Sequence, residues 1–300
     1  MKNLAPIALF SYNRLDFIKI LVDSLKKNSL SKKSIIYIFS DSWKDLEDKK
    51  NVLEVRNFIK NVTGFKKIII ISRKKNYGLA KNIISGVNFV LKKNKKIIVL
   101  EDDLELSKYF LNYLNDGLNI YEKEKKVASI HGWSFPTFQK SNLPNYFFIR
   151  GADCWGWGTW KRAWKKINLN GKKILVDINR RKLEHCFNFN NTYDYLKMLK
   201  DQIKKKNNSW AIRWYGSMFL ENMLTLYPKI SFVKNIGTNK GINSNFDFLN
   251  LGNTILADKY KKLTKIKIEE TYTGRKEIEK FFKKKYLFRF KSFVYKFLNG

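Results

Sequence analysis

The chain has 300 residues, 44% of them hydrophobic, which is enough for one large domain or two small ones. Its formal net charge of +34 comes mainly from lysine, with only ten arginines. Proteins that read nucleic-acid sequence rely on arginine for bidentate base contacts, so this composition argues against nucleic acid as a partner. The charge instead favours diphosphates and anionic membrane surfaces.

Cysteine usage and apolar runs indicate the compartment. Cys154 and Cys186 are the only cysteines and form no CxxC pair, so neither a disulfide framework nor a zinc site is predicted. No apolar stretch reaches the roughly 18 residues of a membrane span, and the N-terminal apolar run is too short for a signal peptide. We therefore expect a cytoplasmic protein.

The first 125 residues alternate strand-like and helix-like patterns. Repeated units of this kind predict a parallel sheet with helices on both faces. No GxGxxG follows the first strand and no GxxxxGK[ST] occurs, which argues against a dinucleotide dehydrogenase and a P-loop NTPase. The expected strands are residues 8–11, 35–39, 68–71 and 96–100, and the helices that follow them are residues 15–27, 53–59, 79–91 and 107–122.

The second half has a less regular pattern, without an internal repeat or a low-complexity linker. The run from Cys154 to Trp160 is rich in tryptophan and glycine, and we expect it to form a loop. We divide the chain into residues 1–125, 126–250 and 251–300. Further strands are expected at residues 127–130, 146–149 and 230–233, and helical patterns at residues 175–208 and 210–226.

Three carboxylates, Glu101, Asp102 and Asp103, stand directly after the apolar run at residues 96–100. That run is short and β-branched, so the acids are predicted at the carboxyl end of a buried strand, where open α/β sheets bind ligands. Such a cluster repels itself unless a cation is near, and its oxygens suit Mg²⁺ or Mn²⁺, which in turn suit diphosphates. The alternative is a solvated acidic loop.

Several motifs, in this order and spacing, resemble the GT-A glycosyltransferases, most closely the bacterial family-2-like sugar transferases. The stretch from Leu100 to Glu105 is also similar to the Golgi N-acetylglucosaminyltransferase that starts hybrid N-glycans. The motifs are Phe10-Ser11-Tyr12-Asn13-Arg14, Asp41, Asn76-Tyr77-Gly78-Leu79-Ala80, Glu101-Asp102-Asp103, Trp155-Gly156-Trp157-Gly158-Thr159-Trp160, Ser209-Trp210-Ala211-Ile212-Arg213-Trp214 and Asn235-Ile236-Gly237.

The resemblance covers roughly residues 4–245. It implies an α/β fold of the GT-A (Rossmann-like) type, with a mostly parallel sheet flanked by helices. It also implies a nucleotide-sugar-binding half at residues 1–125 and an acceptor-binding half of the same domain at residues 126–250, followed by a basic helical tail.

The resemblance further assigns the donor side. Asp103 matches a ligand of a divalent cation, Mn²⁺ or Mg²⁺, which neutralises the leaving diphosphate. Asp102 matches a position near the ribose or the metal, and Glu101 one near the donor sugar. Asp41 matches a residue that accepts from the uracil edge; the alternative is an N-cap of the following helix. The remaining donor-binding candidates are Ser11, Asn13, Arg14, Asn76 and Gly78.

Aromatic residues of the second half are candidates for acceptor binding, because flat sugar faces stack on aromatic rings. Core packing is the usual role of tryptophan, and we expect it for about half of the eight in this chain. The acceptor-binding candidates are His131, Trp133, Trp155 and Trp157.

The general base is not assigned by the resemblance. The Golgi enzyme carries its catalytic carboxylate just after a tryptophan that corresponds to Trp210, whereas this chain has Ala211 and Ile212 there. Neither side chain accepts a proton. The candidates by sequence are, in order of preference, Asp153, Asp201 and Glu221.

The tail from Arg275 to Leu298 has an amphipathic helical pattern, with an apolar and aromatic stripe surrounded by lysine and arginine. Such a helix is typical of a membrane-surface anchor, and the alternative is a helix packed on the domain. The anchor would place the protein peripherally on the anionic inner face of the cell membrane. The stripe comprises Ile278, Phe282, Tyr286, Phe290, Phe293 and Phe297.

These observations favour a metal-dependent, inverting glycosyltransferase. The donor would be a nucleotide sugar, with a UDP-sugar expected, and the acceptor a hydroxyl of a cell-surface glycan, lipid-linked or lipopolysaccharide-type precursor. Two alternatives remain at this point. A sugar nucleotidyltransferase normally has a glycine-rich loop after the first strand, where Ser11-Tyr12-Asn13-Arg14 has no glycine. A non-catalytic basic module for membrane or nucleic acid is favoured by the missing carboxylate at Ala211.

Overall fold

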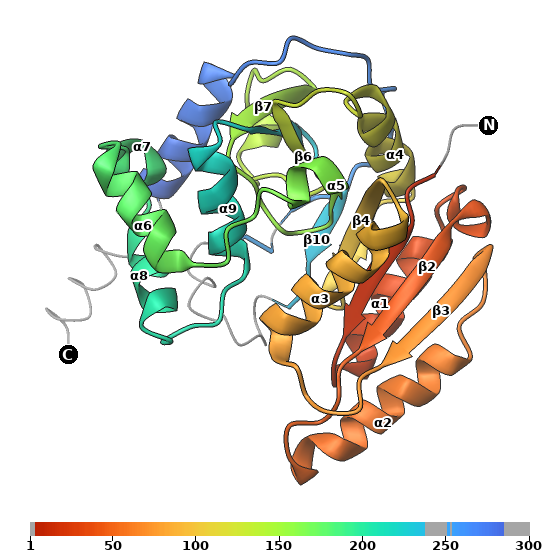
Figure 1. Ribbon diagram of the computed structural model, residues 1–300. Coiled ribbons are helices and arrows are strands. Elements are labelled where there is room, and N and C mark those ends of the chain that lie inside the picture. Colours follow the sequence, from red (N-terminus) through yellow and green to blue (C-terminus); the bar gives the residue numbers. More distant parts are fainter. Residues whose placement is uncertain (1–3, 238–250, 253, 285–300) are drawn as a thin grey trace, which may run out of the picture.

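The computed structural model describes residues 4–237, 251–252 and 254–284. One mixed sheet of eight strands has the order β3-β2-β1-β4-β8-β6-β9-β7, and a separate ribbon pairs β10 with β5 (Figure 1). The strands are β1 Ile7–Ser11, β2 Ile35–Ser40, β3 Lys67–Ser72, β4 Lys96–Glu101, β5 Leu104–Leu106, β6 Val127–His131, β7 Tyr146–Arg150, β8 Trp157–Trp160, β9 Leu224–Pro228 and β10 Val233–Asn235.

The first four strands pair in parallel, as the repeated strand–helix pattern predicts. β1 lies between β2 and β4, and β2 also pairs with β3. Consecutive residues alternate between the two faces, so Ile7 and Leu9 enter one hydrophobic core while Ala8 and Phe10 enter the other. The predicted α/β class with a mostly parallel sheet is confirmed.

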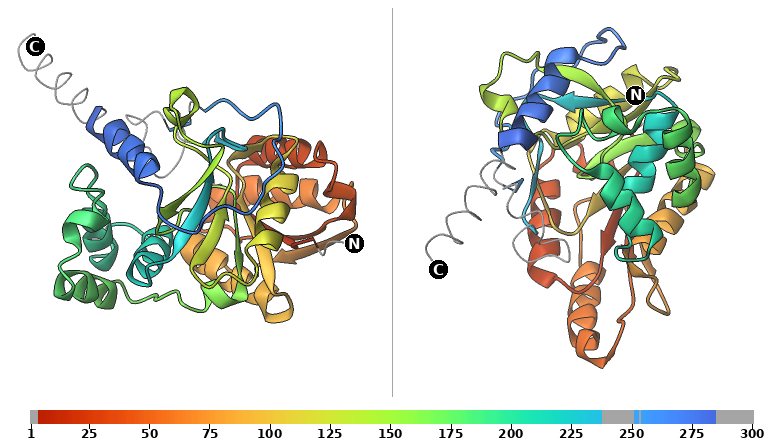
Figure 2. Two further views of the ribbon diagram at one scale, coloured as in Figure 1. Left: turned by 90° about the horizontal axis from the view of Figure 1, so that it is seen from above. Right: turned by 90° about the vertical axis from the view of Figure 1, so that its left-hand side faces the viewer.

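Helices cover both faces of this sheet (Figure 1, Figure 2). Apolar residues of α1, α2 and α4 fill the first core, and those of α3 and α5 fill the second. The group α6, α7 and α8 lies at the end of the molecule opposite β3 (Figure 2). The helices are α1 Leu15–Lys26, α2 Leu46–Lys60, α3 Gly78–Lys93, α4 Phe110–Ile120, α5 Lys161–Trp164, α6 Gly171–Arg180, α7 Glu184–Phe187, α8 Tyr195–Ile203 and α9 Ala211–Leu220.

The tryptophan-rich run is only partly a loop, which corrects the expectation from sequence. Residues Trp157–Trp160 form β8, which is antiparallel to both β4 and β6 and joins the two halves of the sheet. Gly158 makes this possible, because a Cβ there would lie 2.9 Å from Leu118 Cδ1 of α4 and 3.2 Å from the Ile97 carbonyl oxygen. The strand therefore depends on close packing that periodicity does not reveal.

Further boundaries differ from the sequence expectation, and the helical pattern expected at residues 175–208 is divided among α6, α7 and α8. The helix expected at residues 210–226 ends at Leu220, and Asn222 then adopts a left-handed conformation with φ of 53°. Such a residue terminates a helix, and β9 follows, fully buried between β6 and β7. The late strand lies at Val233–Asn235 rather than at residues 230–233, because it pairs with β5.

The C-terminal part of the described chain is helical over residues 272–284. Ile278, Phe281 and Phe282 are buried in the protein core. The first part of the expected amphipathic stripe is therefore covered by protein, which corrects its assignment to a membrane surface; Tyr286, Phe290, Phe293 and Phe297 lie outside the described residues. Among the helices of the described chain, none is long and apolar enough to cross a membrane.

Candidate active site

The predicted donor residues come together because parallel strands end at the same edge of the sheet. β1 pairs with β2 through Ser11 and Ser40, and with β4 through Phe10 and Glu101. The segments that follow these strands therefore lie side by side. They carry Ser11 to Arg14, Asp41, and Glu101 to Asp103.

Arg14 holds two of the three carboxylates. Its Nη2 atom donates to Asp102 Oδ1 and lies 3.2 Å from Asp103 Oδ2, and the Tyr12 backbone N–H donates to Asp102 Oδ2 at 3.2 Å. Burial raises the pKa of Asp102 to about 6, although Arg14 opposes the shift. Burial also raises the pKa of Glu101, and the charges of Asp103 and Asp102 raise it further. The carboxylates of the cluster thus repel one another, and Arg14 offsets only part of the cost of holding them together as anions.

Asp103 is the more accessible of the two carboxylates that pair with Arg14, with a side chain 20% exposed against 6% for Asp102. The Ile236 N–H donates to the Asp103 carbonyl oxygen at 2.9 Å, which holds the turn after β10 over it. Gly237 has no room for a side chain, because a Cβ would lie 2.7 Å from Asp103 Oδ2. The Asn235-Ile236-Gly237 motif is thereby brought onto the acidic cluster.

The acidic cluster suits a divalent cation shared with a substrate. Across the described residues, no group of three or more His, Cys, Asp or Glu side chains is arranged to enclose a metal ion. Mg²⁺ and ions of similar chemistry are usually bound by one or two carboxylates together with substrate phosphates, rather than by a cage of protein ligands. Asp103, partly exposed and adjacent to two further acidic side chains, fits that pattern.

Asp41 links β2 to the start of α3. Its two carboxylate oxygens accept hydrogen bonds from the Tyr77 and Gly78 backbone N–H groups, each at 2.9 Å. Gly78 has φ of 69°, a conformation that glycine adopts without strain. The alternative that Asp41 caps the following helix α2 is wrong, since Asp45 caps it by accepting from the Asp48 N–H.

The remaining donor candidates have varied surroundings. Asn76 donates to the Ser42 carbonyl oxygen at 2.6 Å, so it lies beside Asp41. Asn13 donates to Asp48 of α2 at 2.7 Å, and Tyr12 donates to the same carboxylate. Ser11 Oγ is buried and has no hydrogen-bond partner within the described part of the chain.

The acceptor candidates lie near β6 and the segment that precedes β8. His131 is fully buried, and its Nε2 atom accepts from the Trp155 backbone N–H at 3.1 Å. Burial lowers the pKa of His131, so its imidazole is neutral at neutral pH. Trp155 is half-buried and contacts the Trp133 ring edge-on at 4.9 Å. Trp133 is only 2% exposed.

Trp157 does not fit the expected acceptor role. Its side chain is completely buried, and its ring lies 5.5 to 5.7 Å from the rings of Trp164, Trp210 and Trp214. These four tryptophans form part of the second hydrophobic core. Trp155 is therefore the member of the tryptophan-rich motif whose ring reaches the surface.

Of the three base candidates, the structure brings only Asp153 to this region. Its Oδ2 atom accepts from the Tyr227 hydroxyl at 3.2 Å, its Oδ1 atom accepts from the Cys154 N–H at 2.8 Å, and its side chain is 31% exposed. Burial raises the pKa of the Cys154 thiol, and the charges of Asp153, Glu101 and Asp103 raise it further.

The other two base candidates make surface ion pairs. Asp201, on α8, lies 2.5 Å from Lys197 Nζ. Glu221, after α9, lies 2.5 Å from Lys166 Nζ.

Tyr227, which binds Asp153, was not among the residues that the sequence indicated, because nothing in the pattern of β9 marks it as different from a core residue.

The family comparison agrees with this arrangement. The model of the family described as "Glycosyl transferase family 2" matches residues 7–233, and the chain belongs to this family. The match extends from β1 to the start of β10 and so includes Arg14, the acidic triplet and Asp153.

Solved structures show only distant similarity. TarS from S. aureus (residues 1–349) is 14% identical over 51% of this chain and 42% of its own, with a TM-score of 0.33. Its complex with UDP-GlcNAc is 13% identical over 60% and 48%, also with a TM-score of 0.33. The mannosyltransferase PcManGT from Pyrobaculum calidifontis, in complex with GDP-Man and Mn²⁺, is 9% identical over 74% and 72%, with a TM-score of 0.38. The chain thus spans less than half the length of the TarS chains, and no curated protein matches it.

Proposed function

We propose that the protein transfers a sugar from a nucleotide sugar to an acceptor hydroxyl, with Mn²⁺ or Mg²⁺ as cofactor and with inversion at the sugar carbon. A UDP-sugar is the expected donor, and a cell-surface or lipopolysaccharide-type glycan precursor is the expected acceptor. The observation that carries the proposal is the acidic triplet at the carboxyl end of β4, two of whose carboxylates pair with Arg14, in a chain of this family.

Each half of the site has a part in this reaction. Asp103 would hold the metal ion, which when bound neutralises charge on the leaving diphosphate. Arg14 keeps Asp102 and Asp103 in place, and Glu101 lies where the donor sugar is expected. Asp153 would take the proton from the acceptor hydroxyl as that oxygen attacks the sugar. The contact of Asp41 with a uracil edge remains part of this proposal.

Family membership separates this proposal from its alternatives. A sugar nucleotidyltransferase is disfavoured because the chain belongs to a glycosyltransferase family over most of its length. A non-catalytic basic module is disfavoured by the buried, ion-paired acidic cluster. A surface that bound only membrane or nucleic acid would gain nothing from placing negative charge there.

Donor hydrolysis tests the proposal without knowledge of the acceptor. The purified protein, incubated with Mn²⁺ and a panel of UDP- and GDP-sugars, should release the nucleoside diphosphate from at least one donor, with water as the acceptor. EDTA should stop the release, and added Mn²⁺ or Mg²⁺ should restore it. If no donor is hydrolysed and no nucleotide binds by calorimetry with either metal, the proposal is wrong.

We also propose that the tail brings the enzyme to the anionic inner face of the cell membrane. Because Ile278 and Phe282 are buried in the protein, we assign the contact to residues 285–300, which carry four cations and no acid. Each cation near such a surface contributes about 1 kcal/mol. A chain ending at Lys284 should lose binding to acidic liposomes but keep UDP binding.

Salt provides the control for this prediction. The Debye length falls from about 10 Å at 0.1 M salt to about 3 Å at 1 M, so liposome binding by the full chain should weaken accordingly. If the truncated protein still binds acidic liposomes, the tail is not the anchor. DNA fragments of different base sequence, added as competing polyanions, should reduce liposome binding to the same extent as one another.

A further inference from the structure

The chain beyond the family-matched region returns to the outer strand of the sheet. The family match ends at residue 233, yet residues 270 and 271 lie along β7. The Thr271 N–H donates to the Phe148 carbonyl oxygen at 2.8 Å, and the Arg150 N–H donates to Glu270 Oε1 at 3.0 Å. Because Arg150 ends β7 and the chain reaches Asp153 three residues later, this pairing supports the segment that carries Asp153.

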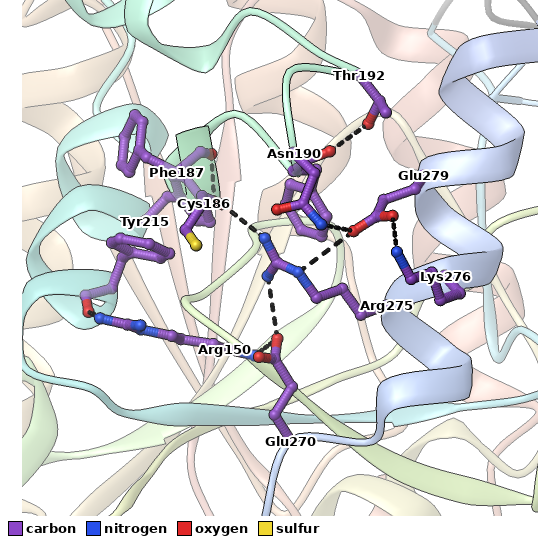
Figure 3. Close-up of polar contacts among 12 residues, drawn as sticks. Arg150, Cys186, Phe187, Asn190, Thr192, Tyr215, Glu270, Arg275, Lys276 and Glu279 are labelled. Atoms are coloured by element: carbon purple, nitrogen blue, oxygen red, sulfur yellow. Dashed lines mark hydrogen bonds and ion pairs between the residues drawn. The ribbon is translucent and has the colours of Figure 1, made fainter. Parts of the chain in front are cut away.

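Arg275 fastens helix 272–284 in this position (Figure 3). Its guanidinium lies 3.2 Å from Glu270 and 3.4 Å from Glu279, and it donates to the Cys186 carbonyl oxygen at 2.6 Å. Glu279 in turn accepts from Asn190 at 2.7 Å. Arg275 is 9% exposed and Glu279 4%, so this ion pair is buried, and loss of either residue would remove a close charge partner from the other.

A continuous line of contacts runs from the helix to Asp153. A Cβ on Gly274 would lie 2.8 Å from Phe147 Cδ2, so the helix backbone rests directly on the Phe147 ring. Phe147 stacks on Tyr227 with ring centroids 6.2 Å apart and an interplanar angle of 16°. The Tyr227 hydroxyl donates to Asp153 Oδ2. Phe147 is fully buried, so it has little room to absorb a displacement of the helix.

A second set of contacts leads from the same helix to the neighbourhood of Asp153. The Phe282 ring lies 4.5 Å from Tyr193 and 6.4 Å from Tyr195. Tyr195 packs on Tyr215 with ring centroids 4.7 Å apart, and a Cβ on Gly151, two residues before Asp153, would lie 2.5 Å from the Tyr215 ring. The Asp153 side chain and the backbone just before it are therefore both reached by contacts that begin at the C-terminal helix.

We propose that helix 272–284 is a positioning element for sugar transfer, which holds Asp153 in place through Gly274, Arg275 and Phe282. The inference rests on the proposed function, since it takes Asp153 as the group that activates the acceptor. If the helix only stabilised the fold, disturbing it would affect UDP binding and turnover alike. The donor groups lie on β1, β2 and β4, and none of the contacts described above reaches them.

Gly274→Ala is the most direct test, because it adds one methyl group against Phe147. Misplacement of a catalytic group by about 1 Å can cost on the order of a hundredfold in rate. We expect kcat for donor hydrolysis, measured with the nucleotide sugar that the wild type turns over fastest, to fall about tenfold to a hundredfold. The KM for the donor, and UDP affinity and stoichiometry by calorimetry with Mn²⁺, should stay at wild-type values.

Two further variants keep the test decisive. Phe282→Leu disturbs the contact with Tyr195 with little change in volume, and should lower kcat in the same selective way. Lys280→Ala, on the exposed side of the same helix, is the matched control and should leave every parameter unchanged. In a Tyr227→Phe background, Gly274→Ala should have little further effect, because coupled residues give non-additive losses.

The outcomes separate this inference from the proposed function. Wild-type kcat in both Gly274→Ala and Phe282→Leu would overturn the inference. So would a fall in UDP-binding stoichiometry that matches the fall in kcat, since that is the result of partial unfolding. Failure of the proposed function would appear earlier, as the absence of hydrolysis by the wild-type enzyme, before any variant is compared.

Discussion

Asp103→Ala should abolish the Mn²⁺-dependent part of UDP binding. Of the two carboxylates that pair with Arg14, Asp103 is the accessible one. If it is the protein ligand of a metal ion that is shared with the diphosphate, the metal binds only weakly once this ligand is removed. Calorimetric titration with UDP, in the presence of Mn²⁺ and then of EDTA, measures the effect. The wild type should differ between the two conditions, and the variant should not.

The fold should survive this substitution. Arg14 keeps its contact with Asp102, and removal of one of three adjacent carboxylates relieves repulsion. The thermal unfolding midpoint should therefore be close to that of the wild type. Asp23→Ala, which removes an exposed carboxylate from α1, is the control and should keep full metal-dependent binding. UDP affinity in Asp103→Ala equal to that of the wild type, with and without EDTA, would contradict the assignment.

The clustering of the residues proposed to bind the donor was predictable because its signals are local. The run at residues 96–100 is too short and too β-branched for a helix, so it fixes the position of the acids at the end of β4. Parallel strands then bring Ser11 to Arg14 to the same edge without further information. The ion pair between Arg14 and Asp102 is a consequence of this topology.

The acceptor half was less predictable because its contacts are formed between distant segments. β8 looks like a loop in sequence, and it becomes a strand only because β4 and β6 lie on either side of it. Tyr227 meets Asp153 across 74 residues. The Golgi enzyme that this chain resembles has its base at the position of Ala211. Here Ala211 begins α9 directly after the buried Trp210, and alanine supplies no carboxylate at that place.

The C-terminal helix shows a limit of amphipathic patterns. The spacing of Ile278 and Phe282 indicates an apolar face but does not say whether lipid or protein covers it. In the structure Phe282 packs against Phe135, Phe189 and Tyr193. The partners that cover this face come from loops with no distinctive sequence, such as the one in which Phe189 and Asn190 adopt left-handed conformations.

Asp153→Asn should lower kcat for donor hydrolysis and for sugar transfer by roughly 10²–10⁴-fold, the usual loss when a general base is removed. The amide keeps the size of the side chain and still accepts from Tyr227 through its oxygen, but it cannot take a proton. UDP binding should be nearly unchanged, because the donor groups lie on other strands.

The two other carboxylates provide matched controls for this variant. Asp201→Asn and Glu221→Gln each remove a surface ion pair with lysine, and such pairs contribute little to stability. Both variants should therefore keep wild-type turnover and wild-type thermal stability.

If Asp153→Asn turned over like the wild type while one of the controls lost activity, the role of general base would move to that residue. A uniform loss in all three, accompanied by weaker UDP binding, would indicate disturbed folding. Loss confined to Asp153→Asn, with UDP affinity intact, is the result that identifies Asp153 as the base, since the Tyr227 hydroxyl and the Cys154 N–H hold its two carboxylate oxygens in place.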